Sequence, residues 1–371
     1  MSELRWADKM LIYENGVCQY FGRKYPACAK CVEVCPNDAL KAGDETIEID
    51  TQKCTQCGDC VSICPSGAIS QKAEFVDTAD ILKNSEATVV FCEKKAWTEL
   101  SSEVTENVKP VLLEHTGVLG ESDFVQVLSL AGGPVVLLGL EEDDKVRPFV
   151  KAAEFVGAIT RKVFGQELVF VFTEKQKFLD RLKDIVSIAP CAGLRVDIDS
   201  QQFSKREAFN AIVGQWIKKT ADLQEVVFDH PAYATIKCDK ERCILCGACA
   251  NQCRLKALSM TDGNRELTLV PARCMNCGVC VELCPEKALS CEGGFSLNES
   301  FFNKSRLART EAVKCSSCGR EFTSAKRAAK VASKLKQARG EDLIRDELLG
   351  LCPDCRTKKA FTDYSGWSEK K

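Results

Sequence analysis

The feature that most constrains this chain is the spacing of its cysteines. The sequence holds 24 cysteines and only two histidines in 371 residues. A CxxCxxxC pattern that begins at Cys28 recurs from Cys246, an offset of 218 residues. A CxxCxxCxxxC run over Cys54–Cys64 recurs over Cys274–Cys284, an offset of 220 residues. Two similar modules therefore flank a segment that is nearly free of cysteine.

The ends and the apolar stretches of the chain bear on where it works. Residues 1–10 contain neither an apolar leader nor a twin arginine, so we expect a cytoplasmic protein. Thiols in that reducing compartment indicate metal ligation rather than disulfides. The most apolar stretch, Phe124–Leu140, is interrupted by Gln126 and by Gly132-Gly133-Pro134, so it predicts a helix, a turn and a buried strand rather than a membrane span. A net charge of −2 gives no overall field toward nucleic acid or membrane.

Each run of four cysteines is followed by proline, at Pro65 and Pro285. Three thiolates at two-residue spacing come from one tight loop, in which Gly58 or Gly278 relieves crowding. Zinc sites prefer two separated cysteine pairs. Runs of four that end in proline are instead typical of bacterial ferredoxins, and the chain resembles two-cluster bacterial ferredoxins over residues 18–70 and 238–291.

This resemblance implies four [4Fe–4S] clusters with crossed ligand sets, because the fourth cysteine of each run ligates the other cluster. The implied sets are Cys243, Cys246, Cys249 and Cys284; Cys274, Cys277, Cys280 and Cys253; Cys54, Cys57, Cys60 and Cys35; and Cys28, Cys31 and Cys64 with a further ligand.

The chain departs from the ferredoxin pattern at two positions. Tyr25 stands where the first cysteine of one set is expected, and we predict that Cys18 replaces it. The alternative is a three-cysteine site that holds [3Fe–4S], or a cubane with a different ligand. Arg254 follows Cys253, at a position where proline usually follows the cysteine. It either raises the reduction potential of the cluster that Cys253 ligates or faces solvent.

The middle segment alternates short apolar runs with amphipathic ones, which predicts a parallel sheet covered by helices on both faces. The expected strands are Ala87–Cys92, Lys109–Leu113, Val135–Leu140, Leu168–Thr173 and Leu194–Ile198. The expected helices are Ala96–Val104, Glu121–Leu130, Val146–Val163, Glu174–Ile188 and Ser204–Ala221.

Part of this segment is similar to the delta iron–sulfur subunit of methyl-viologen-reducing hydrogenases, a partner of heterodisulfide reductase. The similarity is carried by the strand that ends at Cys92, the HTG turn at His115 and the pattern FVQVLSLAGGPVVLLGL. That family uses several cysteines for a [2Fe–2S] cluster, whereas this chain keeps Cys92 and has His115 and Leu140 at other such positions. Because one cysteine cannot hold a [2Fe–2S] cluster, we expect a degenerate, clusterless domain that serves as a scaffold or docking surface. A ligand crevice at the strand ends is the alternative.

Two CxxC pairs near the C-terminus predict one tetrahedral metal site. Its ligands are Cys315, Cys318, Cys352 and Cys355. Zinc is the expected ion and rubredoxin-like iron the alternative, since a polar stretch, Ser324–Gly340, replaces an aromatic core. The basic run Lys314–Arg339 is either a solvated helix face or a surface that contacts an acidic partner protein or nucleic acid, and docking onto a redox partner is expected ahead of nucleic-acid binding. Cys92, Cys191, Cys238 and Cys291 have no assigned metal; we expect Cys191 to be a buried thiol, and Cys238 and Cys291 either buried thiols or substitute ligands.

The sequence thus predicts an α+β and α/β multidomain protein. The expected domains are 1–80, ferredoxin-like; 81–225, α/β; 226–300, ferredoxin-like; and 301–371, a zinc knuckle with a basic helix. With no nucleophile–base pair or nucleotide motif in view, we predict a non-catalytic electron-transfer subunit. The expected partners are a hydrogenase, a formate dehydrogenase or a heterodisulfide-reductase-like flavoprotein. A redox- or oxygen-sensing regulator is one alternative, and a reductase that uses the middle crevice is another.

Overall fold

The structure is a computed structural model that divides into two compact units. It describes residues 2–6, 9–22, 28–71, 87–104, 106, 108–138, 147–191, 193–196, 198, 203–220, 225–261, 265–339 and 346–368. The first unit contains residues 1–232 and 295–302, and the second contains residues 233–294 and 303–371. Each unit is described by itself.

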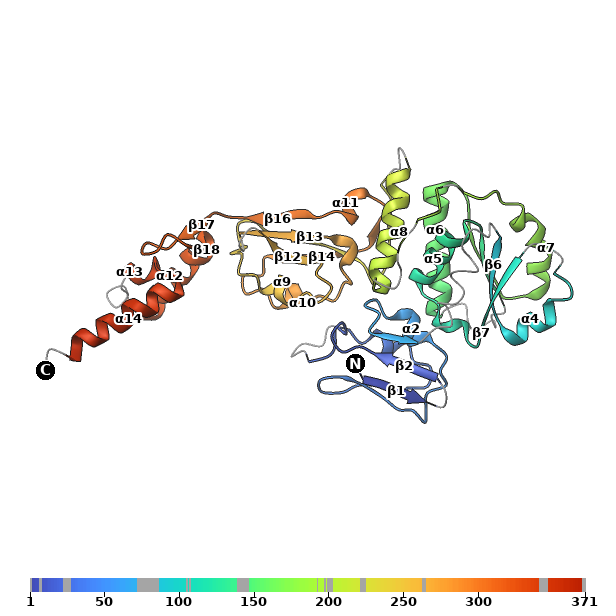
Figure 1. Cartoon of the computed structure of the whole chain (residues 1–371), viewed down its shortest axis with the longest axis horizontal. Coiled ribbons are helices and arrows are strands. Elements are labelled where there is room, and N and C mark those ends of the chain that lie inside the picture. The colour runs from blue at the N-terminus through green and yellow to red at the C-terminus, as the bar shows by residue number, and fades with distance from the viewer. Residues whose placement is uncertain are drawn as a thin grey trace. The chain divides into compact units, whose positions relative to one another are not determined.

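The middle of the first unit is a parallel four-stranded sheet with the strand order β7-β6-β8-β9 (Figure 1). Its strands are β6 (Thr88–Glu93), β7 (Val108–Leu113), β8 (Val135–Leu138) and β9 (Val169–Phe172). Its helices are α4 (Lys94–Leu100), η1 (Thr116–Val118), α5 (Glu121–Ala131), α6 (Pro148–Phe164), α7 (Lys175–Val186) and α8 (Lys205–Lys219). The predicted parallel sheet and its helices are confirmed.

Alternate residues of the central strands enter different cores, because successive side chains of a strand point to opposite faces. Val90 and Val136 pack in one cluster with Leu100 of α4 and Phe178 of α7. Phe91, one residue after Val90, makes an edge-to-face contact with Phe124 of α5. Both faces of the sheet are therefore covered, which is why β8 and β9 consist of apolar residues alone.

The predicted fifth strand, Leu194–Ile198, is wrong over residues 194–196 and 198, which lie outside any strand. Side chains take the place of a strand ladder here. The hydroxyl of Ser129 accepts a hydrogen bond from Val196 N at 3.0 Å and donates to Val196 O at 2.7 Å. Trp216 Nε1 donates to Leu194 O at 2.7 Å. The segment is thus pinned to α5 and α8 rather than added to the sheet.

The cysteine-rich part of the first unit is built from short elements around two small antiparallel sheets, β1-β2-β5 and β3-β4. They are β1 (Ser2–Trp6), β2 (Lys9–Tyr13), α1 (Lys30–Glu33), β3 (Leu40–Ala42), β4 (Ile47–Ile49), α2 (Asp59–Ile63) and β5 (Ile69–Gln71). The unit also contains the pair β10 (Val227–Phe228) and β15 (Phe295–Ser296), and α11 (Glu299–Phe302), which packs on α8.

The second unit repeats the cysteine-rich arrangement and adds a C-terminal knuckle. The repeat consists of β11 (Ala234–Cys238), α9 (Ala248–Gln252), β12 (Leu258–Thr261), β13 (Glu266–Leu269), η4 (Pro271–Arg273), α10 (Val279–Glu282), β14 (Leu289–Gly293) and β16 (Ser305–Arg309). The knuckle consists of β17 (Ala312–Lys314), β18 (Glu321–Ser324), α12 (Ala325–Arg339), α13 (Asp346–Leu349) and α14 (Pro353–Ser368).

Among the described residues, no helix combines the length and the apolar character needed to cross a bilayer.

Candidate metal centres

A cavity in the first cysteine-rich module brings four separated cysteines together. It is lined by Cys18, Cys28, Cys31 and Cys64, the set predicted for one cluster. Tyr13 at the end of β2 lines the same cavity, and Cys18 itself is buried. Burial raises the pKa of the Cys31 and Cys28 thiols, and the nearby Cys64 thiol adds to this.

The second cysteine group of this module surrounds the loop before α2. Cys60 lies near Cys57, Cys54 and Cys35, the other three members of the predicted set. Burial, followed by these neighbouring thiols, raises the pKa of Cys60 to about 12. A metal that binds such thiols must displace their protons, which couples binding to pH.

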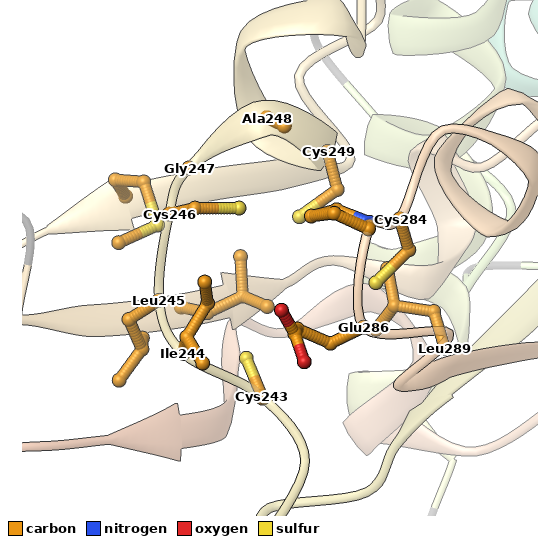
Figure 2. A pocket seen from close by; sticks show the side chains of 13 residues that line it. Cys243, Ile244, Leu245, Cys246, Gly247, Ala248, Cys249, Cys284, Glu286 and Leu289 are labelled. Carbon is orange, nitrogen blue, oxygen red and sulfur yellow. The ribbon is translucent and has the colours of Figure 1, made fainter. Parts of the chain in front are cut away.

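The second module contains the two corresponding groups. One cavity is lined by Cys243, Cys246, Cys249 and Cys284, whose side chains face a shared space (Figure 2). In the other group, Cys280 lies near Cys274, Cys277 and Cys253. Burial raises the pKa of Cys249 and of Cys280 to about 12, and the neighbouring cysteines contribute. In both modules the crossed sets predicted from the sequence are therefore neighbours in space.

The cysteine loops share a backbone device that explains their spacing. Gln56 and Gly58 in the first module, like Asn276 and Gly278 in the second, have positive φ angles of 60°, 88°, 56° and 74°. Two left-handed residues so close together wind the chain tightly, so that successive cysteines point to one side. The backbone N–H groups of Ala39 and Ala288 then donate to Cys35 Sγ and Cys284 Sγ at 3.2 and 3.3 Å.

Strand register shows that Cys18 corresponds to Cys243. Tyr13 pairs with Ile69, and Cys238 pairs with Leu289, each partner lying five residues after the fourth cysteine of its run. Cys18 follows Tyr13 by five residues, as Cys243 follows Cys238. The extra residues of the first module therefore lie after Cys18, between it and Cys28. Tyr25, the position first compared with Cys243, lies outside the described residues.

The C-terminal cysteines form the tightest group. The four Sγ atoms all lie within 4.8 Å of one another; they belong to Cys315, Cys318, Cys352 and Cys355. Cys318 Sγ is 3.9 Å from Cys352 Sγ. A tetrahedral ion with metal–sulfur bonds of about 2.3 Å separates its ligands by about 3.8 Å, so this group fits a single ion. Backbone N–H groups, that of Cys352 first, lower the pKa of Cys315 to about 6, which favours the ligating thiolate.

Four cysteines lie outside these sets. Cys92 is fully buried in the sheet, and burial raises its pKa to about 12, so its thiol is poorly reactive. Cys191 is half-buried, which corrects the expectation of a buried thiol. Cys238 and Cys291 are also half-buried, and both contact predicted ligands: Cys238 hydrogen-bonds to Cys243, and Cys291 to Cys274.

The middle domain contacts the first cysteine-rich module at the loop around Cys57, among other places. Gly117 of η1 lies against the loop at Cys57, where an added Cβ would collide with Cys57 O. Arg147, just before α6, donates to Asp59 Oδ1 from Nη2 at 3.0 Å and to Cys57 O at 3.3 Å. The carboxylate of Asp59 is 4% exposed. A comparison of the two runs would have shown this acidic residue, because Val279 takes its place in the second.

Comparison with known families agrees with this geometry. The family model described as the 4Fe-4S dicluster domain matches residues 26–68 and 242–288. The chain carries two 4Fe–4S dicluster domains. Together with the parallel sheet and the four-cysteine knuckle, they confirm the predicted multidomain α/β architecture. No curated protein matches the chain.

Proposed function

We propose that this iron–sulfur electron-transfer protein relays single electrons through four [4Fe–4S] clusters, one on each crossed cysteine set. The observation that carries the proposal is the pair of cavities, in each of which three cysteines from the first half of the module meet the fourth cysteine of the run that follows. The equivalence of Cys18 and Cys243 supports a complete set of four thiolates in the first domain. When bound, the clusters supply reversible one-electron chemistry.

The arrangement within each domain suits conduction. Cys31 of one set lies near Cys60 of the other, and Cys249 lies near Cys280 in the second domain. Helices α1 and α2 are in contact, as are α9 and α10. The two cysteine sets of each domain are thus adjacent, so an electron moves between their clusters without a mobile carrier.

For the knuckle we propose structural zinc. The four sulfurs are spaced for one ion rather than for a cubane. The knuckle is joined to the dicluster domain beside it, since Ser324 Oγ donates to Ile244 O at 3.0 Å and Lys326 Nζ to Lys240 O at 2.6 Å. A closed site of four thiolates would hold β17, β18 and α12 against that cysteine loop.

The proposed partners are redox enzymes of the hydrogenase, formate dehydrogenase or heterodisulfide-reductase-like class, which rests on the resemblance of the middle domain. Helix α12 favours an acidic docking partner, because residues 325–339 carry six basic and no acidic side chains. Its Lys330 pairs with Glu286, which lines a cysteine cavity, so the basic helix begins beside a proposed cluster.

Metal analysis of the anaerobically purified chain tests the proposal. We expect about sixteen iron atoms, an equal amount of acid-labile sulfide and one zinc ion per chain. The reduced protein should give electron paramagnetic resonance signals of [4Fe–4S] clusters. A colourless protein that holds zinc alone would contradict the proposal, and iron near eight would remove two clusters from it.

The alternative of a nucleic-acid-binding sensor would also use α12. Two of its lysines already contact the dicluster domain, which favours the electron-transfer proposal. Salt-dependent binding of duplex DNA by the full chain would instead support the sensor.

A further inference from the structure

The two cysteine cavities are equivalent by strand register, but different side chains surround them. Tyr13 and Cys238 occupy the same position at the end of β2 and β11. The residue that follows each of them makes the same backbone hydrogen bond. Glu14 N–H donates to Ala68 O, and Asp239 N–H donates to Ala288 O, both at 2.8 Å. The side chains at this position therefore occupy matching places beside the two cavities.

At this position each domain presents a different donor to the equivalent ligand. The phenol of Tyr13 hydrogen-bonds to Cys18 and accepts a bond from Thr46 Oγ1 at 3.4 Å. The thiol of Cys238 hydrogen-bonds to Cys243. A phenolic O–H is a good donor, whereas S–H is a weak one. Cys18 thus receives the stronger hydrogen bond.

A second equivalent pair differs in the same direction. Ser66, two residues after Cys64, has its hydroxyl 3.7 Å from Cys64 Sγ. Glu286, two residues after Cys284, replaces it and lines the second cavity, where Figure 2 shows its carboxylate directed toward the space between the cysteines. A hydroxyl can donate to a thiolate, whereas a carboxylate can only accept.

Cations stand beside both cavities and leave this difference in place. Lys30 lines the first cavity, at the position of Ala248 in the second. Beside the second cavity, Lys330 Nζ lies 2.9 Å from Glu286 Oε2. The charge of Lys326 is also close enough to contribute to lowering the pKa of Cys243. The side chain of Lys330 is 40% exposed, so water weakens its effect. Buried hydroxyls act in a medium of lower dielectric constant.

We infer that the hydroxyls of Tyr13 and Ser66 give the cluster held by Cys18, Cys28, Cys31 and Cys64 a higher reduction potential than its counterpart at Cys243. Hydrogen bonds to ligand sulfur stabilise the more negative, reduced cluster. Each cluster takes up one electron, supplied in the test by dithionite through redox mediators. The inference rests on the proposed function, since it requires clusters at these cysteines.

Redox titration of the anaerobic full chain, followed by electron paramagnetic resonance, tests the inference. Tyr13→Phe keeps the ring and removes the donor. We expect the reduction constant of one cluster to fall about tenfold, which is about 59 mV for one electron. Ser66→Ala should lower the reduction potential of the same cluster by a smaller amount. Glu286→Gln should raise the reduction potential of a different cluster, whose potential in the wild-type chain is the lower of the two.

Tyr20→Phe is the matched control. Tyr20 lies in the same domain, but its hydroxyl donates to Gly43 O at 2.6 Å and it does not line the cavity. All signals should therefore stay in place. The inference is overturned if neither Tyr13→Phe nor Ser66→Ala lowers a reduction potential at unchanged iron content. It is also overturned if the cluster that these two variants affect has, in the wild-type chain, a lower potential than the cluster that Glu286→Gln affects. Iron content far below sixteen in the wild-type chain would instead refute the proposed clusters.

Discussion

The loops Cys54–Cys60 and Cys274–Cys280 have the same cysteine spacing but different surroundings. In the first domain, a Cβ placed on Gly58 would lie 2.5 Å from Val118 N of the middle domain. In the second, no described residue lies within 4 Å of the equivalent point on Gly278. The first loop is thus part of a domain junction, whereas the described residues leave the second open at this glycine. Equal motifs can therefore serve different contacts.

One residue explains much of this difference. Asp59 follows Gly58 and is paired with Arg147, whereas Val279 follows Gly278. A buried carboxylate requires a charged partner to offset its desolvation. The middle domain supplies that partner to the first loop. The second loop, with valine, makes no such demand on a neighbour.

The largest expected effect concerns the first cavity. Cys18→Ser should abolish one [4Fe–4S] signal and lower iron by between about one and about four atoms, because serine oxygen is a poor substitute for thiolate. Iron analysis and electron paramagnetic resonance measure the change. Cys191→Ser is the control and should leave both unchanged. Full iron with four [4Fe–4S] signals in the Cys18 variant would break the equivalence of Cys18 and Cys243.

Removal of the cation at the junction should have the next largest effect. Arg147→Met leaves the Asp59 carboxylate buried without this partner, and we expect a loss of about 3 kcal/mol. In a unit of this size, that lowers the thermal midpoint by about 6–12 °C.

Calorimetry under anaerobic conditions measures this shift. The double variant Asp59→Val/Arg147→Met removes both charges and puts at position 59 the valine that the second loop has at Val279, so it should recover most of the loss. If the double variant were as unstable as Arg147→Met alone, the ion pair would not account for the junction.

The close approach of η1 gives a smaller effect. Gly117→Ala places a methyl group against Cys57 O, which should cost about 1–3 kcal/mol through local displacement. Gly16→Ala is the matched control, since no described residue lies within 4 Å of its added Cβ, and it should change stability by less than about 0.5 kcal/mol. Equal midpoints for the two variants would show that the loop and η1 are not packed as described.

The smallest effect should come from the basic helix. Arg327→Glu on the exposed face of α12 should slow electron transfer to an acidic ferredoxin a few-fold at low salt, and the difference should vanish at high salt. Stopped-flow absorbance measures the rate. Lys183→Glu, an exposed charge reversal on α7, is the control. The same slowing in both variants would point to net charge rather than to docking at α12.

Much of the candidate site was predictable because ligand spacing is a local property. The CxxCxxC runs place three thiolates in one tight loop whatever the rest of the chain does. The resemblance to two-cluster ferredoxins then implies which fourth cysteine completes each set. The sheet was predictable for a similar reason, since runs such as 135–138 are too apolar to be exposed. The expected strand at 194–198 failed because its contacts with Ser129 and Trp216 are not local in sequence.

The sequence by itself therefore indicated the cysteine sets through their spacing, their repeat and a family resemblance, and the alternation of strands and helices through patterns of neighbouring residues. The tertiary structure decided which other residues surround two cysteine sites that have the same spacing. The bond between Arg147 and Asp59 joins residues 88 positions apart, and the register of β2 with β5 brings Tyr13 to the cavity that Cys64 enters. Such contacts depend on how separate elements pack, and no local pattern encodes them.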